Sequence, residues 1–519
     1  MTCLVCKATS ATPCGGCGTV SYCGKECQKK HWKEHKSKCK AYKIVSSAEE
    51  HGRHVIAARD IKAGETLMVT KPFSVGPRMH NPTVCCLGCH QAQGKLLACD
   101  KCGLPVCSVK CAGSITHQIE CTLISNSRAK AEAGSPAPVP GIMVVTPLRI
   151  IGLKFTKPDL YETALSMESN ITTLKTRQLW KYLDTHVVQP ILALQLEGIT
   201  ADIIERTVGI ILTNAFEVMA KGCLLFGLFF EPAMMNHHCV GNTRLVLDSS
   251  NLMTVLASQQ IKKGKPIKFN YGRALDTTTT RQGHLLENKY FSCQCERCLD
   301  PTELGSHVSS LKCREDKCEG ATVPKDPMCV KGDWICEKCE AMVNADCVKK
   351  LLKGLQKETE NLDRNDMKAV KKVFNRYSGK LYKNHGVLTE LKQYIISGLG
   401  RLPGYEMEDL KESDHKQKII LCQEVLEVLD IVEPGLTLGR GLMMFELHSS
   451  LVMVSNMEFE KKQNPGQLLC RLLEADKFLR EAEKILKMEP RNSPYGHLAA
   501  TIKSNLVDLN NYIETVKNM

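Results

Sequence analysis

The sequence predicts an α+β multidomain protein, and three observations lead to that prediction. Its 519 residues exceed what one hydrophobic core normally supports, so several packed units are expected. Most of its 28 cysteines gather before residue 345, at spacings typical of zinc sites. From about Ala345 to the end these patterns stop, and charged and apolar residues alternate as they do in helices.

Composition excludes some classes of protein. No apolar segment follows Met1, and the most apolar run, Leu224 to Met235, is short and carries Glu231, so we expect neither a secretory signal nor a membrane span. Without export, zinc explains the cysteines better than disulfides. The formal charge of +13 falls to about +3 once 22 zinc thiolates and about six zinc ions are counted. Nucleic acid is therefore not the expected main ligand, and we expect a cytoplasmic and/or nuclear monomer.

Residues 1–40 hold eight candidate zinc ligands in an order that suits two interleaved tetrahedral sites. His31 lies nearby as an alternative to His35. So small a unit has almost no core, and zinc would supply its folding energy. Its lysine-rich stretch from Lys25 to Lys43 is interpreted as a solvated helix face, with docking of acidic partners as the alternative. The two predicted ligand sets are Cys3, Cys6, Cys23 and Cys27, and Cys14, Cys17, His35 and Cys39.

Residues 85–121 repeat the same ligand order and predict a second finger. Cys85 is an alternative to Cys86, but only Cys86 leaves a two-residue gap before Cys89. Two such units form a tandem and not a solenoid, which needs more repeats. The two predicted ligand sets are Cys86, Cys89, Cys107 and Cys111, and Cys99, Cys102, His117 and Cys121.

The remaining segments before residue 290 mix strands and helices. In residues 41–84, the stretch 56–67 predicts two strands around a turn at Lys62-Ala63-Gly64, just after His51-Gly52-Arg53-His54. Residues 122–200 begin with a proline-rich linker and continue with helical periodicity over 158–196. Residues 201–290 predict a helix from Ile203 to Ala220, with an end near Asn214 as the alternative. A hairpin over 245–257, a turn over 261–267 and a helix over 281–290 follow.

The chain is organised around the segment Met235–Asn242, whose letters are MNHHCVGN. Cys239 has no close cysteine partner, whereas three later cysteines, Cys293, Cys295 and Cys298, lack a fourth ligand. A tetrahedral zinc site is complete if Cys239 joins those three. The metal would then clamp Asn236 and His237 against the segment that follows Tyr271.

Residues 291–345 contain a further cysteine set, and residues 346–519 predict stacked helices. Cys313, Cys318, Cys336 and Cys339 are interpreted as a zinc ribbon, with Cys329 and Cys347 as rival ligands and loop cysteines without metal as the plain alternative. Helices are expected over 418–432, 438–460, 467–488 and 494–516, separated by Pro and Gly. They predict either a bundle packed on the rest of the chain or a peptide-binding concavity.

Together these motifs resemble the SMYD family, protein-lysine methyltransferases that combine a SET domain with MYND zinc fingers. Asn236-His237, Cys239, Tyr271 and the Cys293-x-Cys295-x2-Cys298 triplet resemble the SET core and its post-SET zinc site. Both fingers have the MYND spacing. Because one of them is an additional N-terminal finger, the chain most closely resembles the arthropod-type SMYD proteins, which also have one. The resemblance implies a β-rich SET domain split by a MYND insertion, a post-SET zinc site and an all-α, TPR-like C-terminal lobe.

The resemblance also implies cofactors and residue roles. S-adenosyl-L-methionine (SAM) and Zn²⁺ are the expected cofactors, and Tyr271 is the expected catalytic residue, with its oxygen near the transferred methyl group. A lysine is methylated as the neutral amine, which an enclosed channel favours. The cofactor-binding residues that the resemblance implies are His51, Gly52, Arg53, Asn214, Asn236, His237, Tyr271 and Phe291.

Four positions depart from the family pattern. His54 replaces a glycine, His238 a serine and Gly241 a proline. Lys289 stands where family members often place a channel tyrosine, although Tyr290 is adjacent, and a cation there would repel a lysine ammonium.

Two hypotheses follow from these patterns. The first is a methyltransferase that acts on histone or other protein lysines. The second is an inactive SET and MYND adaptor that regulates transcription at chromatin through protein contacts. In either case, proline-containing peptides are candidate ligands of the fingers.

Overall fold

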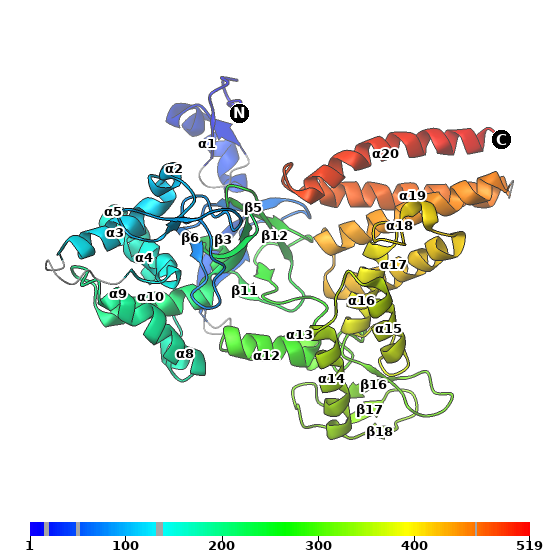
Figure 1. Ribbon diagram of the computed structural model, residues 1–519. Helices are drawn as coiled ribbons and strands as arrows, with labels where there is room; N and C mark the ends of the chain where they lie inside the picture. The colour runs from blue at the N-terminus through cyan, green and yellow to red at the C-terminus, as the bar shows by residue number, and fades with distance from the viewer. Residues whose placement is uncertain (15–19, 48–51, 131–138, 462–463) are drawn as a thin grey trace.

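The computed structural model describes residues 1–14, 20–47, 52–130, 139–461 and 464–519. Figure 1 shows a β-rich centre from which a small N-terminal unit projects, with short helices on one side and long C-terminal helices on the other. Two large hydrophobic cores correspond to this division, one in the first 267 residues and one from Leu275 to Val516. The fold is therefore mixed α+β, with a substantial helical C-terminal part.

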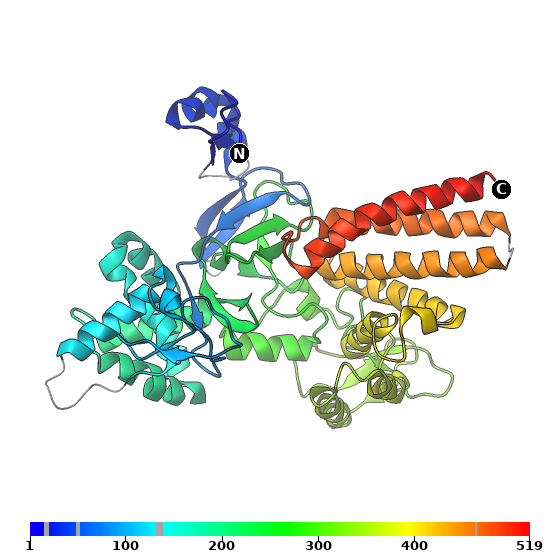
Figure 2. The ribbon, with the colours of Figure 1, turned by 45° about the horizontal axis from the view of Figure 1, so that its top comes forward.

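The N-terminal finger consists of two short strands and one helix, and it stands away from the rest of the chain (Figure 2). Its own small core contains Cys14, Tyr22 and Cys39. Because so few apolar side chains are buried here, hydrophobic burial contributes little to its folding. Its elements are β1 (Thr12–Pro13), β2 (Ser21–Tyr22) and α1 (Lys25–Cys39).

The centre contains several short sheets whose strands come from distant parts of the sequence. In one three-stranded sheet, β13 (Met253–Ala257) lies between β5 (Thr66–Thr70) and β12 (Thr243–Leu247) and pairs with both. β12 and β13 form the predicted hairpin. A second joins β6 (Ser74–Pro77), β10 (Cys223–Leu228) and β9 (Phe216–Ala220). Two-stranded pairs complete the centre: antiparallel β3 (Tyr42–Ser47) with β4 (Gly52–Ala57), and parallel β11 (Asn236–His237) with β14 (Lys268–Phe269).

The second finger is inserted between β6 and the helices, and it packs into the first core. Leu87, Leu104 and Val106 are almost fully buried and belong to that core together with several of the finger's cysteines. Its elements are β7 (Leu97–Ala98), β8 (Pro105–Val106), α2 (Val109–Ala112) and α3 (Ile115–Lys130).

The helical region between residues 142 and 214 is more broken than the periodicity predicted. Asn170 adopts a left-handed conformation, with φ of 48°, and interrupts the predicted helix over 158–196. The helix predicted from Ile203 to Ala220 ends at Asn214, the alternative end, because the chain turns into β9 at Phe216. The elements are η1 (Ile142–Val144), α4 (Val145–Ile151), α5 (Leu153–Thr156), α6 (Pro158–Leu165), α7 (Ile171–Lys175), α8 (Gln178–Leu183), the π-helical η2 (Asp184–Val188), α9 (Gln189–Leu192) and α10 (Ala201–Asn214).

Short elements then connect the centre to the C-terminal helices. The helix predicted over 281–290 begins earlier, because Thr277 caps it by accepting the Thr280 N–H. Four short strands form the predicted ribbon as one antiparallel sheet. The elements are α11 (Phe230–Ala233), α12 (Thr278–Asn288), α13 (Glu296–Leu299), β15 (Leu311–Lys312), β16 (Ala321–Pro324), β17 (Trp334–Cys336) and β18 (Met342–Val343).

The C-terminal helices pack each against the next and bury a core of their own, as Figures 1 and 2 both show. Pro465 and Pro494 begin two of them, after the capping residues Asn464 and Ser493. The helices are α14 (Ala345–Glu360), α15 (Met367–Ser378), α16 (Gly386–Gly398), η3 (Met407–Asp409), α17 (Glu412–Val432), α18 (Leu438–Glu460), α19 (Pro465–Leu486) and α20 (Pro494–Lys517). Among the residues described, no helix combines the length and apolarity that spanning a bilayer requires.

The helical part is joined to the central hairpin by buried polar contacts. The Arg244 guanidinium pairs with Glu489 and donates to the Ile485 carbonyl at 3.2 Å. The Leu436 N–H donates to the Ser258 carbonyl at 2.8 Å. Gly435 has φ of 89°, and a Cβ at this position would collide with the same carbonyl oxygen. The two parts therefore meet backbone to backbone at this point.

Candidate active site

Among the described residues, at least five groups of four side chains place their ligand atoms within 4.8 Å of one another. A tetrahedral zinc site with Zn–S bonds of about 2.3 Å separates its sulfur atoms by about 3.8 Å. The Sγ–Sγ distance is 3.7 Å for Cys89 and Cys107 and 3.4 Å for Cys239 and Cys298, so the thiols suit zinc. The groups are Cys3, Cys6, Cys23 and Cys27; Cys86, Cys89, Cys107 and Cys111; Cys99, Cys102, His117 and Cys121; Cys239, Cys293, Cys295 and Cys298; and Cys313, Cys318, Cys336 and Cys339.

The sixth predicted ligand set is described in part. His35 Nε2 lies 3.4 Å from Cys14 Sγ, and Cys39 Sγ lies 3.6 Å from the same atom, whereas Cys17 falls outside the described residues. The rival ligand His31 instead has its Nδ1 at 2.8 Å from the Tyr22 hydroxyl. Three further rival ligands, Cys85, Cys329 and Cys347, belong to none of these five groups, and no two of the described cysteines form a disulfide.

The central cluster, Cys239 with Cys293, Cys295 and Cys298, rests on a buried ionic network. Arg281 Nε lies 3.2 Å from Cys239 Sγ, and its NH2 group lies 3.5 Å from Cys298 Sγ. Glu303 pairs with Arg281 at 2.6 Å and with Arg297 at 2.8 Å. Thiolates bound to zinc carry excess negative charge, so Arg281 is placed to stabilise them.

The segment around Cys239 is held against the strand that precedes Tyr271. The parallel pairing of β11 with β14 is extended by the His238 N–H, which donates to the Phe269 carbonyl at 3.0 Å, and by the Asn242 N–H, which donates to the Lys268 carbonyl at 3.1 Å. Gly241 passes so close that a Cβ would lie 3.0 Å from Asn270 N. This spacing gives a physical reason for glycine at a position where the resemblance implies proline.

His237 connects the central cluster to Tyr271. Its Nδ1 accepts the Tyr271 N–H at 3.0 Å, and its Nε2 lies 3.2 Å from Cys239 Sγ. Burial lowers the pKa of His237 to about 3, so the ring is a neutral imidazole. The Tyr271 hydroxyl donates to the Met235 carbonyl at 2.6 Å, and burial raises the pKa of this phenol. Tyr271 is thus fixed at its backbone and at its hydroxyl by one short segment.

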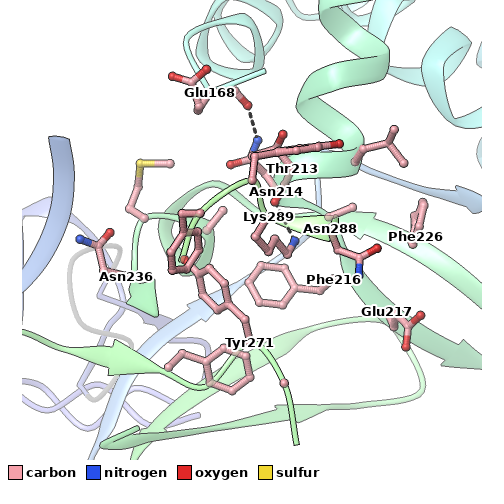
Figure 3. Close-up of a pocket in the computed structure, with 18 of the residues that line it drawn as sticks. Glu168, Thr213, Asn214, Phe216, Glu217, Phe226, Asn236, Tyr271, Asn288 and Lys289 are labelled. Carbon is pink, nitrogen blue, oxygen red and sulfur yellow. Dashed lines mark hydrogen bonds between the residues drawn. The ribbon is translucent and has the colours of Figure 1, made fainter. Parts of the chain in front are cut away.

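Tyr271 faces a cavity of about 850 Å³ (Figure 3). Of the predicted cofactor-binding residues, those that line it are Gly52, Arg53, Asn214, Asn236, Tyr271 and Phe291. His237 lies outside this lining, with both ring nitrogens facing protein atoms, and His51 falls outside the described residues. Phe291 packs on the central cluster, with its ring centroid 5.9 Å from that of His237 and 6.5 Å from that of Tyr271.

The opposite wall of the cavity combines β4 with the end of α10. Gly52 has φ of 109°, a conformation that side chains rarely adopt, whereas His54 is buried in the β3–β4 ladder and does not line the cavity. Arg53 donates to the Ser166 carbonyl at 2.6 Å. The Asn214 amide nitrogen donates to the carbonyls of Glu168 and Ile210, at 2.7 and 2.8 Å, so its amide oxygen is the group left to face a ligand.

Lys289 also points into this cavity (Figure 3). Its Nζ donates to the Thr213 carbonyl at 2.7 Å and lies 5.7 Å from the centroid of the Tyr271 ring. Burial lowers the pKa of Lys289 to about 8, although the charge of Glu217 acts in the opposite direction. Tyr290, the neighbouring candidate for the channel position, has φ of 65° and lines the cavity as well.

Sequence reasoning missed several residues of the lining. Glu168 and Glu217 contribute to the cavity without belonging to any motif, whereas Thr213 and Phe216 flank Asn214 in the segment that resembles the family's cofactor-binding one. His238, which departs from the family pattern, bridges the Val240 carbonyl at 2.7 Å and the Glu296 carboxylate at 3.0 Å. It therefore ties the Cys239 segment to α13.

Comparisons with known proteins agree with this geometry. The SET domain profile matches residues 52–272, a range that spans the inserted finger, and the MYND finger profile matches residues 3–39. The Drosophila melanogaster proteins "SET domain-containing protein SmydA-8", isoforms A and B, are 32% and 30% identical over 306 and 308 residues. The chain thus has the domain combination of SMYD proteins, a SET domain with an N-terminal MYND finger. The two alignments cover 57% of this chain and 64% and 66% of the relatives, just under two thirds of their length.

Other relatives of this chain are more distant. The Arabidopsis thaliana protein "Histone-lysine N-methyltransferase ASHR1" is 27% identical over 61% of this chain and 68% of its own length. The Mus musculus protein "Histone-lysine N-methyltransferase SMYD3" is 23% identical over 50% and 61%. Among solved structures, the SET domain of LSMT bound to lysine and AdoHcy aligns over 93% of this chain and 92% of that chain, at 12% identity and a TM-score of 0.26. So loose a superposition says nothing about function.

Proposed function

We propose that this chain transfers a methyl group from SAM to the side-chain amine of a protein lysine. The observation that supports this proposal best is the convergence of Tyr271, Asn236, Asn214 and Gly52 on one cavity beside the central cluster. Catalytic sites commonly combine such an enclosed cavity with a few fixed polar groups. The substrate lysine would belong to a histone or another protein.

The cavity is suited to a cofactor of the size of SAM. Its volume of about 850 Å³ lies within the range usual for ligand sites. The main chain at Gly52 is accessible to a ligand, because a Cβ at this position would meet no other described atom within 4 Å. When bound, SAM would supply an electrophilic methyl group on a sulfonium. We expect it to be held by His51, Gly52, Arg53, Asn214, Asn236 and Phe291, with His237 positioning Tyr271 from outside the cavity lining.

The phenol of Tyr271 would provide a fixed polar oxygen. Its proton is directed to the Met235 carbonyl, so the oxygen lone pairs are available to other groups. Its raised pKa keeps it protonated, and it acts as a neutral dipole rather than as a base. His237 orients Tyr271 from the backbone side, because its Nδ1 accepts the Tyr271 N–H.

The walls of the cavity would help to present the amine in its reactive, neutral form. Phe216, Phe269 and Phe291 line it with apolar surface, and low polarity disfavours an ammonium. An enclosed site also aligns the amine with the methyl group, which is the main requirement of this displacement reaction. The fingers lie outside this cavity, so we assign them to docking of protein partners, including proline-containing peptides.

The proposal is tested by measuring transfer of labelled methyl groups from SAM to a mixture of histone and other protein substrates. Tyr271→Phe should lower transfer by about 10²-fold, because it removes a fixed polar oxygen. Tyr512→Phe is a matched control, since its hydroxyl contacts the Ser455 carbonyl in the helical part, far from the cavity in the fold. Equal transfer by the wild type and Tyr271→Phe would contradict the assignment of Tyr271.

A second candidate function is a SET and MYND adaptor without catalysis. Lys289 favours it, because its ammonium occupies the cavity beside Tyr271. Calorimetry with SAM and the zinc-replete chain separates the two functions. Absence of SAM binding would support the adaptor and exclude the methyltransferase.

A further inference from the structure

Lys289 is directed into the cavity by the local backbone. It follows the last residue of α12, and its own N–H still bonds to the Leu285 carbonyl. The next residue, Tyr290, is left-handed with φ of 65°, so the chain turns away there and Lys289 stays on the cavity side. Lys289 and Tyr290, which set the direction of the chain here, both precede the zinc-ligand triplet that begins at Cys293.

The Lys289 ammonium has no close negative partner. Its Nζ donates to the Thr213 carbonyl, and the Tyr271 ring lies beneath it at 5.7 Å. No carboxylate of the described residues lies within 4.0 Å of it. Glu217 acts on it only at longer range and also pairs with Arg78 at 3.9 Å. The positive charge of Lys289 is therefore incompletely compensated inside the cavity.

The contacts of Lys289 are those that an incoming alkylammonium would use. A carbonyl acceptor and the face of an aromatic ring are the two features that hold such a cation in an enclosed site. Here the Thr213 carbonyl and the Tyr271 ring are both engaged by the chain itself. Two ammonium groups at this half-buried position repel each other more strongly than in open water, because protein atoms replace part of the screening solvent.

We propose that Lys289 determines which charge is accepted at one position of the cavity: its ammonium takes the place of a substrate ammonium at the Thr213 carbonyl and the Tyr271 ring, so this position admits a neutral or anionic group and rejects a second alkylammonium. The inference deepens the proposed function, since it specifies in which form an acceptor amine can enter beside Tyr271. A substrate lysine then enters as the neutral amine or after Lys289 has withdrawn. The lowered pKa of Lys289 agrees with its enclosed position.

The selectivity is tested with two small probes of equal chain length, n-pentylamine and n-pentanol. Their binding to the full, zinc-replete chain is measured by ligand-observed NMR at about pH 7, without SAM. Lys289→Met should strengthen pentylamine binding more than about tenfold, while Lys289→Arg, which keeps the charge, should leave it at the wild-type level. Pentanol binding should change less than about threefold among the three proteins.

A matched control is Lys154→Met, because Lys154 also donates to a carbonyl, that of Gly198 at 2.6 Å, but lies outside the cavity. It should leave the binding of both probes unchanged. Equal pentylamine binding by the wild type and Lys289→Met would overturn the proposal, as would a gain in Lys289→Arg. If Lys289→Met fails to fold, the wild type alone decides, because pentylamine must then bind more weakly than pentanol.

This experiment is independent of the methyltransferase proposal. It uses no cofactor, so charge selectivity can hold in a chain that does not bind SAM. Conversely, if the chain binds SAM and all variants bind pentylamine equally, the result would support the proposed function and contradict the role of Lys289.

Discussion

The N-terminal finger and the inserted finger share one ligand order, yet they are held in different ways. In the N-terminal finger, Cys6 and Cys23 are exposed, and the local core is limited to a few residues. In the inserted finger, Cys86, Cys102 and His117 have no exposed surface, and several of its cysteines belong to the main core. The same sequence pattern thus gives one unit that depends on metal and one that the protein interior also supports.

The inserted finger is fixed by a buried ionic contact behind its histidine ligand. His117 Nδ1 donates to Glu120 at 3.0 Å, while its Nε2 faces Cys102 Sγ at 3.4 Å. Glu120 in turn accepts from Arg149 at 2.9 Å, and Arg149 also donates to the Leu87 carbonyl. A carboxylate behind a histidine ligand fixes its orientation and raises its basicity. The comparison teaches that a ligand pattern identifies a metal site, whereas its surroundings decide how much the fold depends on it.

The strongest way to break this comparison is to remove Arg149. Arg149→Met leaves Glu120 as a buried, unpaired carboxylate beside His117, so we expect unfolding free energy to fall by about 3–5 kcal/mol. Urea denaturation followed by circular dichroism measures the loss. Lys30→Met, on the exposed face of α1, is the control and should change stability by less than about 0.5 kcal/mol. A stability unchanged in Arg149→Met would show that the inserted finger is not supported by the core.

The central cluster extends the comparison, because its cysteines lie against the buried Arg281, much as the inserted finger depends on the buried Arg149. Arg281→Leu should weaken zinc binding at Cys239, Cys293, Cys295 and Cys298 by about 10–100-fold, since residues that hydrogen-bond to metal ligands have effects of this size. Competition with a zinc-binding dye measures the affinity. Arg376→Leu, which removes an exposed ion pair with Glu358, is the control and should bind zinc like the wild type. Equal affinity in both variants would contradict the role given to Arg281.

The two fingers should lose zinc at different rates when the metal is removed. A chelator should take zinc from the N-terminal finger at least about tenfold faster than from the inserted finger, because exposed thiols exchange metal more readily than buried ones. Native mass spectrometry counts the ions, and limited proteolysis locates the opened segment. We expect cleavage within residues 1–40 first, with the remainder intact. Simultaneous release from both fingers would argue against independent units.

The smallest expected effect concerns His31, the rival ligand of the N-terminal finger. His31→Ala removes its contact with the Tyr22 hydroxyl, so we expect a loss of about 1 kcal/mol in that finger alone. Zinc stoichiometry should remain that of the wild type, and the main thermal transition should not move. A lost zinc ion would mean that His31, and not His35, ligates the metal.

Sequence reasoning found the motifs with short internal spacing most accurately. Ligand groups such as Cys86-x2-Cys89 or Cys313 with Cys318 come together in the structure because local chain geometry brings them close. Cys239 is paired with a triplet more than fifty residues later by counting unfilled ligand positions, and their sulfur atoms do lie together, 3.9 Å apart for Cys239 and Cys293. Zinc coordination requires a fixed ligand number, and that requirement made a distant contact predictable.

Other features of the structure could not be predicted from a rule like the fixed ligand number of zinc. The breaks in the helical region after residue 158 arise from single conformations, such as the left-handed Asn170, that periodicity does not record. Glu168 reaches the cavity from a loop that tertiary packing positions, so no sequence motif marked it. Lys289 is recognisable as unusual from its spacing to Cys293. Its contacts with the Thr213 carbonyl and the Tyr271 ring became visible only in the fold.

The close backbone contact at Gly435 has a consequence for how this protein can be divided. No side chain fits between Gly435 and the Ser258 carbonyl, so the central hairpin and the C-terminal helices are closely packed against each other at this point. A truncated version that ends near residue 345 would leave Arg244 without Glu489 and would open the second core to water. Expression trials and crystallisation should therefore keep the helices attached, whichever half carries the chemistry.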